Sequence, residues 1–452
     1  MEITFLGAVQ TVTGSKYLLS FNHKKILVDC GLFQGLKELR LRNWRALPMD
    51  AGAISRVILT HAHIDHSGYL PLLNKQGFEG DILCTHGTHD LCSVLLPDAG
   101  YLQEEEARYA NKYGYSKHHT AQPLYTMNDA LLVLKKFSPH PFHQPIALDQ
   151  NTTLEFLHAG HIIGASVIRI THEGKTLVFS GDLGRPQDEV MRAPECVTEA
   201  DALVIESTYG NRTHPGAHPL LELAEVINRT VNRGGSIIVP SFAVGRAQAL
   251  LYFIYELKQR GEIPDLPVYL DSPMAENATD IFMKYPNEHR LSVEVVRGMC
   301  RHVRYVKTPE ESKQIDTMKT PIIVISASGM VTGGRVLHHI KHFAPNAKNT
   351  ILFSGYQAEG TRGARMLGGE KQVKMLGEMV PVRAEVAVLE NLSAHADANE
   401  TIQWLKQFKR APRQVFITHG EPASAATLKT RIESELGWHC AVPTDGQHER
   451  LF

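Results

Sequence analysis

Metal-binding side chains are concentrated in one short stretch, and this stretch constrains the chain more than any other feature. Residues 61–66 read His-Ala-His-Ile-Asp-His and follow the strand-like run Arg-Val-Ile-Leu-Thr of residues 56–60. In an extended segment, side chains two residues apart project to the same side. We therefore expect His61 and His63 to reach one metal ion together.

The second half of this stretch is expected at the start of a helix. Asp65 and Ser67 are good N-cap residues for the apolar run of residues 69–73, so Asp65 and His66 are predicted on the turn before that helix. Such a turn can direct two ligands to one ion and two to another. Imidazole and carboxylate ligands suit zinc, with manganese or iron as alternatives.

One pattern recurs along the chain: a short apolar or β-branched run, then small or polar residues, then an amphipathic stretch. These runs lie at residues 176–179, 202–205, 236–239, 321–325, 350–353 and 414–418. Continuous runs of this length fit strands covered on both faces, which predicts α/β layers. Four polar residues each come just after such a run, namely His61, Asp182, Glu206 and His419. Because ligand sites of α/β sheets gather beyond the carboxyl ends of strands, we expect a site there.

Length and composition set the class of protein. A chain of 452 residues with 43% hydrophobic and 21% charged residues is typical of a soluble globular protein with two domains. Its N-terminus reads as a strand instead of a signal peptide, and its six cysteines have no close spacing, so we expect a reducing cytoplasm. The net charge of −1 indicates that any RNA binding must use local positive potential from metal ions and a few arginines.

Further motifs resemble those of a known superfamily. The pattern His61-x-His63-x-Asp65-His66 resembles the signature of the metallo-β-lactamase superfamily, and the remaining motifs follow in the expected order. They are Asp29 in Ile-Leu-Val-Asp-Cys-Gly, His161 in Ala-Gly-His-Ile-Ile-Gly and Asp182 in Phe-Ser-Gly-Asp-Leu-Gly. The resemblance implies that Asp29 orients the metal-binding residues without binding the metal itself, and that His161 binds zinc.

Three later motifs resemble the β-CASP branch of that superfamily, the nucleases of RNA maturation and DNA repair. Glu206 matches its motif A, His395 its motif B and His419 its motif C. The resemblance spans essentially the whole chain. It is greatest to bacterial and archaeal RNA-processing members and to the endonuclease subunit of the eukaryotic pre-mRNA cleavage machinery. DNA-repair members typically carry valine in motif C, so His419 favours RNA.

The resemblance implies a fold, a domain order and a ligand set. The expected fold is a metallo-β-lactamase αββα sandwich at residues 1–210 and 384–452, with an inserted α/β β-CASP domain at residues 211–383 and the active site between the domains. Two zinc ions per chain are implied. One is bound by His61, His63 and His161, the other by Asp65, His66 and His419, and Asp182 bridges the two.

Glycine- and serine-rich strand-to-helix turns in the inserted region predict phosphate contacts. Backbone N–H groups in such turns can face an anion, and we select Ser328, Gly329 and Arg246. The pairs His338-His339 and His118-His119 match no ligand position of the family. Adjacent residues on a helix point about 100° apart, so we interpret both pairs as surface or interdomain residues.

The function implied is a zinc-dependent ribonuclease that acts on single-stranded RNA by a two-metal hydroxide mechanism, leaving 5′-phosphate and 3′-hydroxyl ends. Asp182, Asp65, His395 and Glu206 are the expected catalytic residues, with His395 as general acid and Glu206 as its partner. Four alternatives stay open: a small-molecule ester or thioester hydrolase, a DNA nuclease, an inactive RNA-binding scaffold, and a 5′-to-3′ exonuclease in place of an endonuclease. Dimeric relatives also keep a homodimer open, and the role of residues 95–145 is not defined.

Overall fold

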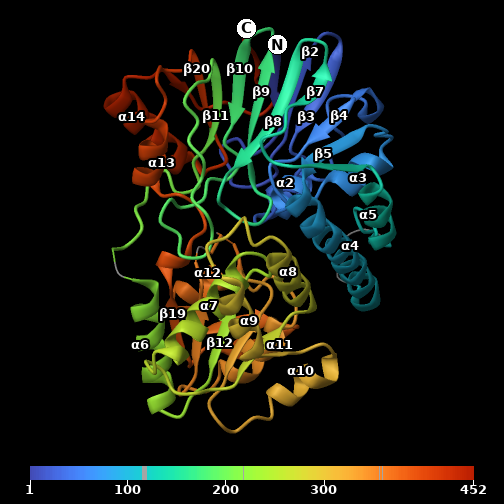
Figure 1. Cartoon of the computed structure of the whole chain (residues 1–452). Helices are drawn as coiled ribbons and strands as arrows, with labels where there is room; N and C mark the ends of the chain where they lie inside the picture. Colours follow the sequence, from blue (N-terminus) through green and yellow to red (C-terminus); the bar gives the residue numbers. More distant parts are fainter. Residues whose placement is uncertain (115–119, 217, 356, 359) are drawn as a thin grey trace. The chain divides into compact units, whose positions relative to one another are not determined.

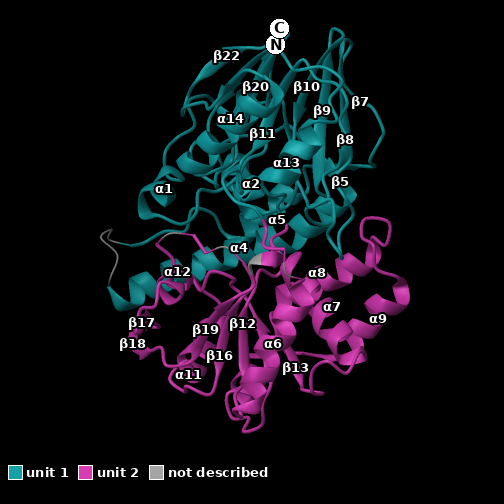
Figure 2. Ribbon diagram, turned by 90° about the vertical axis from the view of Figure 1, so that its left-hand side faces the viewer, with its two compact units in different colours: residues 1–213, 395–452 teal, residues 214–394 magenta. Residues whose placement is uncertain are grey.

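A computed structural model describes residues 1–114, 120–216, 218–355, 357–358 and 360–452 of the chain. It contains two compact units, which are coloured separately in Figure 2. Unit 1 consists of Met1–Thr213 and His395–Phe452, and unit 2 of His214–Ala394. Unit 2 is therefore an insertion into unit 1. Figure 1 shows the same elements coloured along the chain.

Unit 1 is built on two seven-stranded sheets. The first has the order β22 (His448–Arg450), β1 (Glu2–Phe5), β2 (Tyr17–Phe21), β3 (Lys24–Val28), β4 (Arg56–Ile58), β5 (Asp81–Thr85) and β6 (Phe137–His140). The second has the order β21 (Cys440–Ala441), β20 (Gln414–Thr418), β11 (Ala202–Glu206), β10 (Lys175–Phe179), β9 (Ser166–His172), β8 (Thr152–His158) and β7 (Ile146–Asp149).

The inner faces of these two sheets share one hydrophobic core. Phe5 of the first sheet lies 5.0 Å from Phe416 of the second, and Tyr17 lies 5.6 Å from Phe179, measured between ring centroids. Side chains from the two inner faces interdigitate here, and their burial stabilises the sandwich. The core therefore joins strands from both ends of the chain.

Helices flank the sandwich of unit 1. They are α1 (Lys37–Arg42), α2 (Ile64–Ser67), α3 (Leu70–Lys75), α4 (His86–Tyr113), α5 (Met127–Leu134), α13 (Ala398–Leu405) and α14 (Pro422–Leu436), with a short 3-10 helix at Ala51–Ala53. Within residues 95–145, α4 and α5 are followed by strand β6, so this region is only partly helical. The two termini lie side by side in Figure 1, because β22 pairs antiparallel with β1.

Unit 2 is a parallel sheet wound with helices. Its six strands have the order β14 (Val303–Tyr305), β13 (Val268–Asp271), β15 (Ile323–Ser326), β12 (Ile237–Pro240), β16 (Thr350–Phe353) and β19 (Glu385–Val388). Its helices are α6 (Pro219–Asn232), α7 (Arg246–Gln259), α8 (Pro273–Lys284), α9 (Val293–Arg301), α10 (Pro309–Ile315), α11 (Val336–Phe343) and α12 (Arg362–Leu367). A hairpin of β17 (Gln372–Met375) and β18 (Glu378–Pro381) and a 3-10 helix at Glu390–Leu392 complete it.

The strands of unit 2 explain the continuous apolar runs in the sequence. Every residue of β12, β15 and β16 is buried, as expected for parallel strands covered on both faces. The predicted α/β class is therefore confirmed. Strand β19, just after the expected domain limit at residue 384, pairs with β16 of this sheet. Among the described residues, no helix is both long and apolar enough to cross a membrane.

His339 lies in the interior of unit 2, so its interpretation as a surface or interdomain residue was wrong. Its side chain is fully buried on α11, with Nε2 2.6 Å from Asp271 Oδ2 and Nδ1 2.9 Å from Asp316 Oδ1. The neighbouring His338 is exposed, and His118 and His119 lie outside the described residues. Two carboxylates that converge on one buried imidazole favour its charged form, which the sequence pattern alone does not reveal.

This buried ion pair predicts a pH dependence of stability. Burial opposes protonation of His339, but its hydrogen bonds to Asp271 and Asp316 outweigh that effect and raise its pKa to about 9. In the unfolded chain the pKa of a histidine is about 6.5. The stabilising effect of the charged imidazole is therefore complete below pH 6.5 and is lost as the pH rises through 9, by up to about 3 kcal/mol.

We expect wild type and His339→Gln to differ most in free energy of unfolding at low pH. Chemical denaturation between pH 6 and about 9.5 measures this difference, and other titrating groups cancel because both proteins carry them. The difference should shrink with rising pH. A difference that stays constant over this range would show that His339 is neutral in the folded protein.

Candidate metal centre

The predicted site residues of unit 1 converge at the carboxyl ends of its strands. Asp29 follows β3, His61 follows β4 and Asp182 follows β10, while Glu206 ends β11 and His419 follows β20. Strands β10, β11 and β20 are mutually parallel, as are β3 and β4, so their carboxyl ends meet at one edge of each sheet. The topology thus brings together residues that are hundreds of positions apart.

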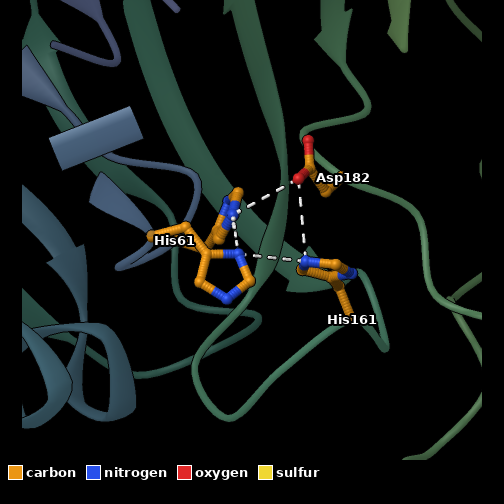
Figure 3. A group of neighbouring side chains, drawn as sticks. His61, His161 and Asp182 are labelled. Atoms are coloured by element: carbon orange, nitrogen blue, oxygen red, sulfur yellow. Dashed lines mark hydrogen bonds and ion pairs between the residues drawn. The ribbon is translucent and has the colours of Figure 1, made fainter. Parts of the chain in front are cut away.

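The first group of candidate metal ligands, here called the first ligand group, contains His61, His63 and His161 with the carboxylate of Asp182. His63 Nδ1 lies 3.1 Å from His61 Nε2 and 3.2 Å from His161 Nε2. Asp182 Oδ2 lies 3.5 Å from His61 Nε2 and 3.6 Å from His161 Nε2. Figure 3 shows His61, His161 and Asp182 pointing toward one another.

These spacings fit a tetrahedral ion. Zinc bonds of about 2.0–2.1 Å to nitrogen and oxygen set neighbouring ligand atoms about 3.3–3.4 Å apart. The four measured distances, from 3.1 to 3.6 Å, bracket that value. The first ligand group therefore has the donor chemistry and the spacing of a metal site.

The second ligand group contains Asp65, His66 and His419. His66 Nε2 lies 3.0 Å from His419 Nε2, and His419 Nε2 lies 3.3 Å from Asp65 Oδ2. All three side chains are largely buried. Two imidazoles and a carboxylate make a second donor set of the same kind.

Asp182 lies between the two groups. Its Oδ2 faces the first group, while its Oδ1 lies 3.3 Å from His66 Nε2 and 3.7 Å from His419 Nδ1. Oδ1 is buried, and no group among the described residues makes a hydrogen bond to it. A buried carboxylate oxygen normally has a partner, so this position fits a cation.

The turn before the predicted helix is itself a one-turn helix. Helix α3 covers the apolar run and begins at Leu70 with Tyr69 as its N-cap, so Asp65 and Ser67 are not its caps. Asp65 and His66 lie before it in α2, which starts at Ile64 with His63 as its N-cap. Backbone bonds from His66 and Ser67 to the carbonyl of His63 start the helix at this point, which local capping preferences did not indicate.

Backbone contacts from two segments fix α2. Cys30 N–H donates to His66 O at 2.7 Å, and Ser15 N–H donates to Asp65 O at 2.9 Å. Buried Lys16 donates to Gly31 O. A Cβ atom on Gly31 would lie 1.6 Å from Asp65 O, so only glycine permits this approach. Neither Lys16 nor Gly31 was singled out from the sequence.

Hydrogen bonds behind the ligands orient their rings. Asp29 Oδ2 lies 2.8 Å from His66 Nδ1, and Asp29 Oδ1 accepts from Thr60 N–H at 2.8 Å. Thr60 Oγ1 also lies 3.1 Å from His61 Nδ1. Thr208 Oγ1 lies 3.1 Å from His419 Nδ1. Sequence reasoning found Asp29 but missed the two threonines, whose only signal is their position beside His61 and Glu206.

Asp29 and His419 both adopt left-handed backbone conformations, with φ of 58° and 48°. Such angles are costly for residues other than glycine and persist where surrounding contacts enforce them. The N–H group of His419 donates to Ala8 O at 2.6 Å, and its carbonyl accepts from Ser207 N–H at 3.2 Å. These two bonds hold His419 in place at the end of β20.

His395 and Glu206 form a pair next to the first ligand group. His395 Nδ1 lies 3.1 Å from Glu206 Oε2 and 4.0 Å from Asp182 Oδ2. Glu206 Oε1 in turn accepts from Leu183 N–H at 2.6 Å. Burial opposes the charge on His395, but the Glu206 carboxylate outweighs it and raises the pKa of His395 to about 9.

The electrostatics of the centre favour bound cations. Burial, followed by the nearby positive charge of His66, holds the pKa of His61 well below its usual value, and burial lowers that of His63 to about 4. Burial opposes charge on His66 as well, yet the carboxylates of Asp182, Asp29 and Asp65 raise its pKa well above normal. The neutral imidazoles of His61 and His63 are ready to coordinate, and the three carboxylates supply the negative charge that a metal ion requires.

The three predicted phosphate-binding residues lie together in unit 2. Ser328 follows β15 and Arg246 starts α7 after β12, and β12 and β15 are parallel neighbours. A Cβ atom on Gly329 would lie 2.9 Å from the backbone nitrogen of Phe242, in the loop between β12 and α7. Ser328 Oγ accepts from Thr332 N–H at 3.0 Å, and Arg246 donates to Ser354 O. The sheet thus gathers all three at the carboxyl ends of its central strands.

Comparison with known proteins identifies the family. A model of the metallo-β-lactamase superfamily matches residues 12–226, and a model of the Beta-Casp domain matches residues 247–366. A model of the Zn-dependent metallo-hydrolase RNA specificity domain matches residues 379–443. The chain is 35% identical over 438 residues to ribonuclease TTHA0252 of Thermus thermophilus, covering 95% of each protein. The chain belongs to the β-CASP family.

Other β-CASP relatives are similar over nearly the whole chain. Transcription termination factor FttA of Methanosarcina mazei is 31% identical, covering 100% of this chain and 72% of that protein. Integrator complex subunit 11 of Danio rerio is 29% identical, covering 99% of this chain and 73% of that protein. A crystallised Enterococcus faecalis protein of unknown function shares the fold alone, with a TM-score of 0.55, 12% identity and 99% coverage of both chains.

Membership of the β-CASP family confirms two predictions. The metallo-β-lactamase fold with an inserted β-CASP domain is the family architecture, and the chain is a metal-dependent hydrolase of a nuclease family. Metal binding rests on this membership and on the histidine–aspartate clusters.

Because Gly31 lies so close to α2, we expect one added methyl group at this position to destabilise the protein. Gly31→Ala forces Asp65 O aside and so displaces the helix that carries Asp65 and His66. We expect it to lower the free energy of unfolding by at least about 3 kcal/mol and to reduce metal content. Thermal unfolding and elemental analysis measure the two effects.

The matched control is Gly52→Ala. A Cβ atom there would meet its nearest neighbour at 3.5 Å, which is ordinary contact. This variant should unfold and bind metal like wild type. If Gly31→Ala also behaved like wild type, α2 would not be held by this contact.

Proposed function

We propose that this β-CASP protein is a ribonuclease that hydrolyses phosphodiester bonds of single-stranded RNA with two zinc ions. The observation that carries the proposal is Asp182. It presents one carboxylate oxygen to the first ligand group and the other to the second. A carboxylate shared by two adjacent donor sets is the arrangement that two-metal hydrolysis needs.

The ligand assignment follows the two groups. One ion would be held by His61, His63 and His161, and the other by Asp65, His66 and His419. Asp182 would bind both ions, and Asp29 would orient the ring of His66. Zinc is favoured by the imidazole-rich donor set, with manganese or iron as the alternatives. When bound, the two ions supply an activated water nucleophile and neutralise charge on the phosphoryl oxygens.

His395 is the proposed general acid. Its Nδ1 contacts Glu206, which fixes the ring and favours the protonated state, so we assign Nε2 as the donor to the leaving 3′ oxygen. The raised pKa keeps the imidazole protonated at neutral pH. Asp182 and Asp65 are the carboxylates proposed to orient the attacking water. The products would carry a 5′-phosphate and a 3′-hydroxyl.

RNA as the substrate is supported by the relatives. One is named a ribonuclease, and the model that matches residues 379–443 describes an RNA specificity domain. Because water is the nucleophile, the chemistry does not use the 2′-hydroxyl, so preference for RNA must come from contacts with the strand. We propose Ser328, Gly329 and Arg246 as phosphate contacts, since their loops offer backbone N–H groups and a guanidinium.

Further proposals concern the setting of the enzyme. Action on RNA and free cysteines fit a cytoplasmic location. The domain limits at residues 210 and 384 and a homodimer stay predictions.

The test is cleavage of a 5′-labelled single-stranded RNA by zinc-loaded protein, beside DNA of the same sequence. His395→Ala should keep its metal and lose about 10²–10⁴-fold in rate, because the leaving oxygen is no longer protonated. The control His439→Ala removes an exposed histidine and should cleave like wild type.

The products distinguish the open alternatives. Internal RNA fragments would establish an endonuclease, and labelled mononucleotide alone a 5′ exonuclease. Equal cleavage of DNA would favour a DNA nuclease. Failure of the metal-loaded protein to cut RNA, with turnover of thioesters or lactones, would contradict the proposal in favour of a small-molecule hydrolase. Full activity of His395→Ala would disprove its role as acid.

A further inference from the structure

A third group of potential metal ligands lies on unit 1, apart from the two groups of the centre. It contains His143, His158 and Glu195, with one ligand atom from each residue and all three atoms within 4.8 Å of one another. His143 lies in the turn between β6 and β7, His158 ends β8, and Glu195 belongs to the loop between β10 and β11. Three separate segments therefore meet at this point.

The geometry of the group is that of an open metal site. His143 Nε2 lies 3.1 Å from Glu195 Oε1, close to the ligand spacing of about 3.3 Å around tetrahedral zinc. The His143 side chain is 52% exposed and that of Glu195 33%, so both can rotate to close on an ion that water also contacts. Two imidazoles and one glutamate are a donor set that binds zinc in proteins.

Packing fixes the third ligand. The ring of His158 stacks on Phe142, with centroids 3.6 Å apart. Burial, then the charges of His143 and Arg192, lower the pKa of His158 to about 4, so it is neutral at physiological pH and needs no deprotonation to coordinate. Arg192 is a nearby cation that opposes a bound ion, and it is exposed to solvent, which screens its charge.

The backbone around the group is also held in place. Glu195 N–H donates to His158 O at 2.8 Å, and Glu195 O accepts from Trp404 Nε1 at 2.8 Å. His143 has a left-handed φ of 62°, and its N–H donates to Phe156 O at 3.0 Å. The backbone that carries the three side chains is thus anchored, which lowers the entropic cost of closing on an ion.

We propose that His143, His158 and Glu195 form an additional zinc-class metal site that fastens the loop carrying His161. That loop begins directly after His158, and a Cβ atom on its Gly160 would lie 2.3 Å from Arg192 O, in the segment that leads to Glu195. An ion held by the three ligands would cross-link the start of this loop, at His158, to the turn that carries His143 and to the segment that carries Glu195. Its role is structural, and it does not depend on the proposed ribonuclease activity.

The test is zinc stoichiometry of the full-length protein, measured by elemental analysis after equilibrium dialysis against buffered excess zinc. His143→Ala and Glu195→Gln should each hold one equivalent of zinc fewer than wild type. His23→Ala is the matched control, because His23 is also an exposed histidine with left-handed φ, at 60°. It should hold as much zinc as wild type.

Repeating the measurement in an Asp182→Asn background separates this site from the centre. The difference of one equivalent between the parent and its His143→Ala derivative should persist there. Zinc should also raise the unfolding temperature of the parent more than that of the derivative. Equal zinc content in wild type, His143→Ala and Glu195→Gln would overturn the proposal and leave His143 and Glu195 as a surface ion pair.

Discussion

The buried carboxylate of Asp182 is the constraint on which the rest of unit 1 depends. An ionised group in a protein interior is costly unless opposite charge compensates it, and Asp29 and Asp65 add two more carboxylates nearby. The surrounding imidazoles meet only part of this demand, and Asp182 Oδ1 has no hydrogen-bond partner among the described residues. Bound cations would complete the balance, so folding and metal binding are linked in this unit.

The topology explains how so many ligands reach one carboxylate. His66 and His419 are in contact although 353 positions separate them. They meet because β20 returns beside β11 in the second sheet, while β22 closes the first sheet against β1. The chain leaves unit 1 after Thr213 and re-enters it at His395, and the two segments of unit 1 meet there, since Ala398 N–H donates to Arg212 O at 3.0 Å. The return places His395 against Glu206, which completes the pair next to the ligands.

The sequence predicted the features that depend on local pattern, and it missed those that depend on tertiary packing. The spacing within residues 61–66 indicated the metal cluster, and the apolar runs indicated the strands. The start of α2 at Ile64 was missed because contacts with Ser15 and Cys30 decide it, not capping preference. His339 was wrongly interpreted as a surface or interdomain residue because Asp271 and Asp316, whose carboxylates pair with it in the interior, lie far from it in the chain. The sequence also did not indicate the group of His143, His158 and Glu195, because these residues come from separate segments that only the fold brings together.

Anomalous X-ray diffraction at the zinc edge, from crystals of the zinc-loaded protein, locates bound ions directly. We expect two strong peaks in the centre, one at the first ligand group and one at the second. Each should lie about 2.0–2.2 Å from a different oxygen of Asp182. A single peak there, or two peaks that leave either Asp182 oxygen uncoordinated, would show that Asp182 does not bridge two ions.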